Sequence, residues 1–136
     1  MKDDSTIRIA LVGNPNCGKT ALFNALTGSK QRVANYAGVT VEKKHGYLIL
    51  PNHVVCTVID LPGTYSLCGR SPDEKITRDV VMNQYADEMP IDLILCVLDA
   101  TNLQNGLRLV LELQQTGKPM LVALNMSDLA KNRGYH

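Results

Sequence analysis

The order of apolar and polar positions along the chain predicts an alternation of strands and helices. Continuous apolar runs are typical of strands buried on both faces of a sheet, and they lie at 7–12, 93–98 and 119–124. Apolar positions at helical spacing mark residues 20–27, 72–87 and 103–115. Two shorter strands, 43–50 and 54–59, are expected to form a hairpin around Pro51 and Asn52. This order predicts an α/β fold with a mainly parallel sheet and helices on both faces.

Local signals fix several element ends. Ser71 precedes Pro72, and Glu74 follows three residues after the serine, a pattern that is typical of a helix start. Gly28 and Gly117 lie just past the other helices, where glycine commonly ends them. Residues 31–41 show no clear period, which predicts a long, mobile loop of the kind that often serves function.

Composition limits the function classes. A chain of 136 residues allows one domain. Its 14 basic and 13 acidic residues give a net charge of +1, which disfavours tight nucleic-acid binding by bulk electrostatics. The longest apolar stretch, 91–100, contains two aspartates and is too short to cross a bilayer. The N-terminus has acids where a secretory signal needs a basic region, so we expect a cytosolic domain.

The cysteines do not indicate a metal centre. They stand at 17, 56, 68 and 96, so no Cys-x-x-Cys pair exists. Cys56 and Cys96 lie in apolar runs and are expected to be small buried side chains.

The strongest functional motif is GNPNCGKT at residues 13–20, the phosphate loop, which fits Gly-x4-Gly-Lys-Ser/Thr between a predicted strand and a predicted helix. Backbone N–H groups at such a helix start close around phosphate oxygens. Lys19 is expected to reach the terminal phosphates, and the Thr20 hydroxyl to bind Mg²⁺. The nucleotide contacts predicted here are Asn14, Pro15, Asn16, Cys17, Gly18, Lys19, Thr20 and Ala21.

Two further segments fit the same chemistry. Asp60 follows a predicted strand, where its carboxylate can help to hold Mg²⁺. The N–H of Gly63 can contact a terminal phosphate and so respond to its presence. Thr40 can supply a second Mg²⁺ hydroxyl that orders its loop when a γ-phosphate is present, with Gly38 and Val39 as nucleotide contacts. The alternatives are an ordinary strand-ending turn and an ordinary loop threonine.

The last predicted strand is followed by Asn125, Met126 and Asp128, which are expected to contact the base of the bound nucleotide. A carboxylate at Asp128 can accept hydrogen bonds from the guanine ring N–H and amine, which adenine does not offer in that arrangement. Asn125 supports it, and the thioether of Met126 can cover the base. A polar helix cap is the alternative interpretation.

In this order and spacing the motifs resemble a translation-factor-class small GTPase domain, and more narrowly the N-terminal G domain of the bacterial ferrous-iron transporter B family, FeoB. The resemblance rests on residues 13–24, 35–42 and 60–67. It implies a P-loop GTPase domain that binds GTP or GDP with Mg²⁺ and switches ferrous-iron uptake. It also implies a cytoplasmic domain of an inner-membrane protein, with a helical regulatory domain and an iron channel as attached partners.

The family pattern continues beyond residue 136. The resemblance therefore implies that residues 1–136 form a GTP-binding domain that is incomplete at its C-terminus. The missing parts would be the last strand, the base-contacting loop and the terminal helix. The oligomeric state stays open.

The resemblance also bears on hydrolysis. Thr64 stands where many GTPases have a water-orienting glutamine, and no arginine is an obvious source of positive charge. Asn16 matches the asparagine that potassium-activated GTPases use as a cation ligand. This match implies slow, K⁺-stimulated hydrolysis in which Asn16, Lys19, Thr40 and Gly63 act.

Two other functions stay open from the sequence. A nucleotide-binding module with little turnover would also explain Thr64. An RNA-associated assembly GTPase is supported only by a basic cluster of Lys30, Arg32, Lys43 and Lys44, which also fits a solvated loop.

Overall fold

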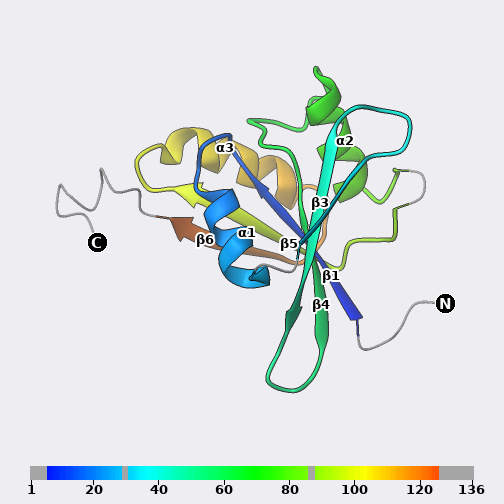
Figure 1. The fold of residues 1–136 in the computed structure, drawn as a ribbon. Helices are drawn as coiled ribbons and strands as arrows, with labels where there is room; N and C mark the ends of the chain where they lie inside the picture. Colours follow the sequence, from blue (N-terminus) through cyan, green and yellow to red (C-terminus); the bar gives the residue numbers. More distant parts are fainter. Residues whose placement is uncertain (1–5, 29–30, 86–87, 126–136) are drawn as a thin grey trace.

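The computed structural model describes residues 6–28, 31–85 and 88–125. They form a six-stranded sheet in the order β2-β3-β4-β1-β5-β6 (Figure 1). The strands are β1 Thr6–Gly13, β2 Gln31–Asn35, β3 Glu42–Ile49, β4 Val55–Asp60, β5 Leu93–Asp99 and β6 Met120–Asn125. The helices are α1 Lys19–Thr27, α2 Pro72–Val81 and α3 Leu103–Gln114. β1 is parallel to β4 and β5, and β5 to β6, whereas β3 is antiparallel to β2 and β4. The predicted mainly parallel sheet and the β3–β4 hairpin are confirmed.

Helices cover both faces of the sheet, as predicted, because alternate side chains of a strand point to opposite faces. In β1, Ala10 and Val12 belong to the core cluster that α2 and α3 complete. Leu11 belongs to the other cluster, where it packs with Phe23 of α1. The carboxyl ends of β1 and β4 therefore lie between the two helical layers, and this edge holds the phosphate loop.

The prediction of a loop over 31–41 is wrong for its first half, where β2 pairs with β3 from Gln31 opposite Gly46 to Asn35 opposite Glu42. Most β2 side chains are exposed, so hydrophobic periodicity gives no signal there. The pairing is made by backbone groups. What remains of the loop is residues 36–41, which we call loop 36–41.

The helix predicted over 72–87 begins as expected but ends early, at Val81. The Ser71 hydroxyl accepts from the Glu74 N–H at 3.2 Å, which confirms the predicted cap. Asn83 adopts a positive φ of 60°, and its N–H donates to the Val80 carbonyl at 3.1 Å. This left-handed asparagine ends the helix in the way glycine often does. Residues 86–87 of the predicted span lie outside the described residues.

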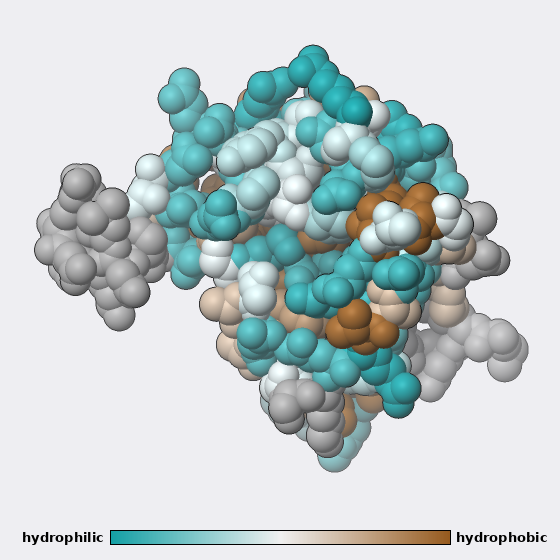
Figure 2. All heavy atoms as spheres, turned by 45° about the horizontal axis from the view of Figure 1, so that its top comes forward, coloured by the Kyte–Doolittle hydropathy of each residue, from teal (hydrophilic) through white to brown (hydrophobic). Residues whose placement is uncertain are grey.

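The apolar run 119–124 forms a strand, but not a buried one. Leu121 and Leu124 of β6 are each 59% exposed, because within the described part of the chain β6 pairs with β5 alone. Elsewhere, the face shown in Figure 2 is mainly hydrophilic, with separate hydrophobic patches. In the described ranges, no helix combines the length and apolarity that crossing a membrane requires.

Candidate functional site

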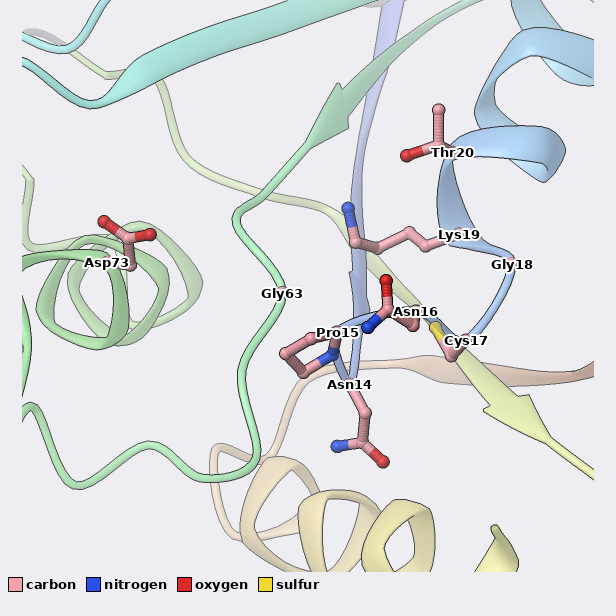
Figure 3. Close-up of a pocket in the computed structure, with 9 residues that line it drawn as sticks. All are labelled: Asn14, Pro15, Asn16, Cys17, Gly18, Lys19, Thr20, Gly63 and Asp73. Carbon is pink, nitrogen blue, oxygen red and sulfur yellow. The ribbon is translucent and has the colours of Figure 1, made fainter. Parts of the chain in front are cut away.

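A cavity of about 650 Å³ opens where β1 ends, the phosphate loop turns and α1 begins. It is lined by Asn14, Pro15, Asn16, Cys17, Gly18, Lys19, Thr20, Gly63 and Asp73 (Figure 3). All but Asp73 are predicted from the sequence. Asp73 stands in the first turn of α2, across the Gly63 segment from the phosphate loop. The pattern 71–74 indicates its helix start but not the tertiary contact that brings it here.

The phosphate loop requires glycine at position 18 for two reasons. Gly18 has a φ of 87°, and a Cβ there would lie 1.8 Å from Asn125 Nδ2. That nitrogen donates to the Cys17 carbonyl at 3.0 Å, so the end of β6 holds the loop. The first turn of α1 carries no acidic residue, and its free N–H groups make a favourable anion site.

Lys19 and Asp60 form a buried ion pair at the end of β4. Opposite charges removed from water stabilise each other only in close contact, so each fixes the other's position. Asp60 and Lys19 also line an adjoining cavity of about 220 Å³. The Lys19 ammonium is a suitable partner for phosphate oxygens, and oxygen donors from Asp60 and Thr20 are those that Mg²⁺ prefers. The oxygen donors of these two residues are therefore of the kind that suits a magnesium ion.

Residues 37–40 of loop 36–41 do not line the 650 Å³ cavity, whereas Val41 at the end of the loop lines the adjoining 220 Å³ cavity. Gly38 and Thr40, both in the described part of the chain, line neither the 650 Å³ nor the 220 Å³ cavity. Thr40 is exposed, and Val39 lines a different cavity of about 560 Å³ beside α2. The Tyr36 N–H donates to the Val41 carbonyl at 3.0 Å, so the loop closes on itself.

An aromatic pair anchors the start of this loop. Tyr36 is 1% exposed, and its ring meets that of Tyr85 edge to face at 5.5 Å. The Tyr85 hydroxyl donates to the Ala37 carbonyl at 2.7 Å. Burial, with the nearby Glu88 carboxylate, raises the pKa of the Tyr36 phenol. Tyr36 is therefore neutral at physiological pH and serves as an anchor.

Cys17 is a packing residue in this structure. It is 2% exposed, and burial raises the pKa of its thiol despite the opposing effect of Lys19. A Cβ on Gly13 would lie 2.7 Å from Cys17 Sγ, which shows how closely the sulfur fills the turn. Burial likewise raises the pKa of Cys96 to about 12, in keeping with the buried cysteine that the sequence predicts.

The predicted base-contacting residues are only partly described. Gly18, Ala21 and Asn125 line a cavity of about 270 Å³ between α1 and β6. Met126 and Asp128 lie outside the described residues. The structure therefore brings Asn125 and Ala21 beside the phosphate loop, and guanine selection by Asp128 stays a prediction.

The chain was compared with known proteins. A family model described as Ferrous iron transport protein B matches residues 7–136. The Fe(2+) transporter FeoB of Leptospira biflexa is 47% identical over 125 residues, which are 92% of this chain and 17% of that protein. The crystal structure of the G domain of the T. maritima FeoB iron transporter has a TM-score of 0.84 at 46% identity, covering 93% of this chain and 76% of that one.

A second T. maritima structure, the cytosolic domain in GMPPNP form, has a TM-score of 0.85 at 46% identity and covers 94% of this chain and 48% of that chain. Of the full-length Leptospira relative, the chain spans about a sixth. Sequence and fold agree over nearly all of its residues, which confirms the resemblance read from the motifs. The chain belongs to the ferrous iron transport protein B family.

Proposed function

We propose that this domain binds and hydrolyses GTP and that its nucleotide state regulates ferrous-iron uptake by a membrane transporter. The observation that carries the proposal is the meeting of Lys19, Asp60 and Gly63 around the phosphate loop, in a chain of this family. We further propose that it acts at the cytoplasmic side of the inner membrane, attached to a helical regulatory domain and an iron channel.

Each residue of the site has a separate role in binding GTP and Mg²⁺. The phosphate-loop backbone and Lys19 bind the phosphates, Thr20 and Asp60 hold Mg²⁺, and Gly63 donates its N–H to the γ-phosphate. Mg²⁺, when bound, offsets the negative charge on the phosphates. Thr40 joins the site only after loop 36–41 moves, which makes this loop the part of the domain that responds to GTP.

Asn16 is proposed as the ligand of a monovalent cation. It lines the cavity in the phosphate loop with a φ of 63°. K⁺, when bound there, supplies positive charge near the β–γ bridge that arginine supplies in other GTPases. Thr64 cannot replace the usual glutamine in this structure, because it is 2% exposed and its hydroxyl donates to the Ser66 carbonyl.

The test is hydrolysis by the full-length protein in K⁺ and in Na⁺ at matched ionic strength. We expect faster turnover in K⁺, and we expect Asn16→Ala to abolish that difference while GDP binding survives. Asn105→Ala, at an exposed position of α3, is the matched control and should keep the difference. Equal rates in both salts would refute the cation mechanism, and no single-turnover hydrolysis at all would favour a nucleotide-binding module.

Guanine selection is tested separately. Asp128→Ala should weaken GTP binding by about 2–4 kcal/mol, because donors on the base lose a charged acceptor. Titration with fluorescent GTP and ATP analogues measures it. Equal affinity of the unaltered protein for both nucleotides would remove the guanine assignment.

The basic cluster gives the RNA alternative little support. The Lys43 ammonium pairs with Glu88 at 2.5 Å, and that of Lys44 with Glu42 at 3.5 Å. Adjacent residues of β3 point to opposite faces, so these two lysines do not form one surface. Lys30 lies outside the described residues. We therefore expect no nucleic-acid partner, which a salt-dependent RNA titration would check.

A further inference from the structure

We propose that Asn14 is a positioning residue that fixes Gly63 against the phosphate loop and thereby distinguishes GTP from GDP. The inference rests on the proposed function, since it assigns a role in the same site. Asn14 stands in the phosphate loop and lines its cavity, but its side chain does not point toward Lys19 and Thr20. In Figure 3 it points toward α3, on the side opposite Lys19 and Thr20.

The contact that Asn14 makes is a buried tertiary hydrogen bond. Its Nδ2 donates to the Thr64 carbonyl at 2.9 Å, and the Thr64 N–H donates to the Gly13 carbonyl at 2.9 Å. Two consecutive loop residues thus hold both backbone groups of Thr64. Asn14 is 5% exposed and Thr64 2%, so water cannot readily replace these bonds.

We call these two bonds to the Thr64 backbone the clamp. The clamp determines where Gly63 lies, because Gly63 directly precedes Thr64. A Cβ on Gly63 would lie 2.9 Å from Pro15 Cα, so the two backbones are in close contact. Thr64 Oγ1 donates to the Ser66 carbonyl at 2.7 Å, which engages the side chain in the turn that follows. The position of the Gly63 N–H is thus set by the phosphate loop before any nucleotide arrives.

The site requires a carboxamide rather than a carboxylate. A Cβ on Gly106 of α3 would lie 3.7 Å from Asn14 Oδ1, so the side chain fills the space between segment 60–66 and α3. Aspartate has the same shape but no N–H, and it would face the Thr64 carbonyl with a second acceptor. Asn14→Asp therefore removes the side-chain bond of the clamp, the one to the Thr64 carbonyl, with little change in volume.

GDP lacks the γ-phosphate that Gly63 contacts, so the clamp acts on GTP alone. In the full-length protein, Asn14→Asp should lower the affinity for a non-hydrolysable GTP analogue about tenfold. It should also slow single-turnover hydrolysis about tenfold, and each change is the effect of one buried hydrogen bond. GDP affinity should change by less than about threefold, since phosphate-loop contacts to the other phosphates remain. Asn105→Asp is the matched control, because it makes the same substitution at an exposed position of α3 that does not line the cavity.

Hydrogen exchange in nucleotide-free protein gives a readout that does not depend on the proposed function. Asn14→Asp should raise amide exchange at residues 63–66 by about tenfold, since opening there loses a buried bond. An equal loss of GTP-analogue and GDP affinity would overturn the inference, because it would mean direct contact or general misfolding. Unchanged exchange would overturn it too. Absence of any guanine-nucleotide binding by the unaltered protein would instead refute the proposed function, while exchange would still decide whether the clamp exists.

Discussion

The two segments expected to contact a γ-phosphate are built in opposite ways. Segment 60–66 is mostly buried, and the phosphate loop holds it through both backbone groups of Thr64. Loop 36–41 is exposed from residue 37 to residue 40 and bonds mainly to itself and to Tyr85. Segment 60–66 is therefore preformed for the proposed phosphate site, whereas residues 37–40 would have to change position to reach it.

The contrast also locates the movable part. Tyr36 at the start of loop 36–41 is fixed in the core, and Val41 at its end is half-buried against that core. Only the residues between them are free of core packing, and Thr40 is one of them. Ordering so short a segment costs less conformational entropy than ordering the whole predicted loop, which suits a switch that must reverse.

The largest expected effect comes from Gly63→Ala. The added Cβ would meet the Pro15 backbone, which cannot yield as a flexible side chain would. Segment 60–66 must then move away from the phosphate loop, and we expect hydrolysis to slow about 100-fold, or about 2.7 kcal/mol of transition-state stabilisation. Single-turnover rates measure this, with GDP affinity as the control. A rate within a few-fold of the unaltered protein would show that segment 60–66 is not a rigid part of the site.

Sequence reasoning succeeds where the signal is local. The phosphate loop and Asp60 to Gly63 are contiguous motifs, each placed at the end of an apolar run, so their strands and their meeting could be predicted. The contacts that make the site rigid join distant residues: Asn14 bonds Thr64, 50 positions away, and Asn125 bonds Cys17, 108 positions away. Such pairs leave no period in the sequence.

The elements that the sequence did not predict also depend on contacts between distant parts of the chain. β2 is held by backbone pairing with β3, which is independent of side-chain pattern. The early end of α2 depends on Asn83, whose side-chain oxygen accepts from the Ile91 N–H at 2.8 Å. That bond forms only after the chain has turned back. Asp73 likewise enters the site through the packing of α2, not through a motif.

A smaller effect is expected at Gly38, where the constraint is the reverse of that at Gly63. Nothing lies within 4 Å of a Cβ built on Gly38, but its φ is 78°. Alanine fits the space yet strains the backbone by about 1–2 kcal/mol. We expect Gly38→Ala to slow hydrolysis about fivefold, while thermal unfolding stays nearly unchanged because the loop can relax. A marked fall in melting temperature would contradict the view that residues 37–40 are free of the core.

The smallest effect is expected from Tyr85→Phe. This change keeps the edge-to-face contact with Tyr36 but removes the hydrogen bond to the Ala37 carbonyl. Because that bond is exposed, its loss should raise amide exchange at residues 38–41 by only about threefold and leave residues 63–66 unchanged. Tyr65→Phe, which removes a hydroxyl from a half-exposed ring in the other segment, is the matched control. If Tyr85→Phe altered both segments equally, the two segments would be coupled, and the division between a fixed and a movable half would be wrong.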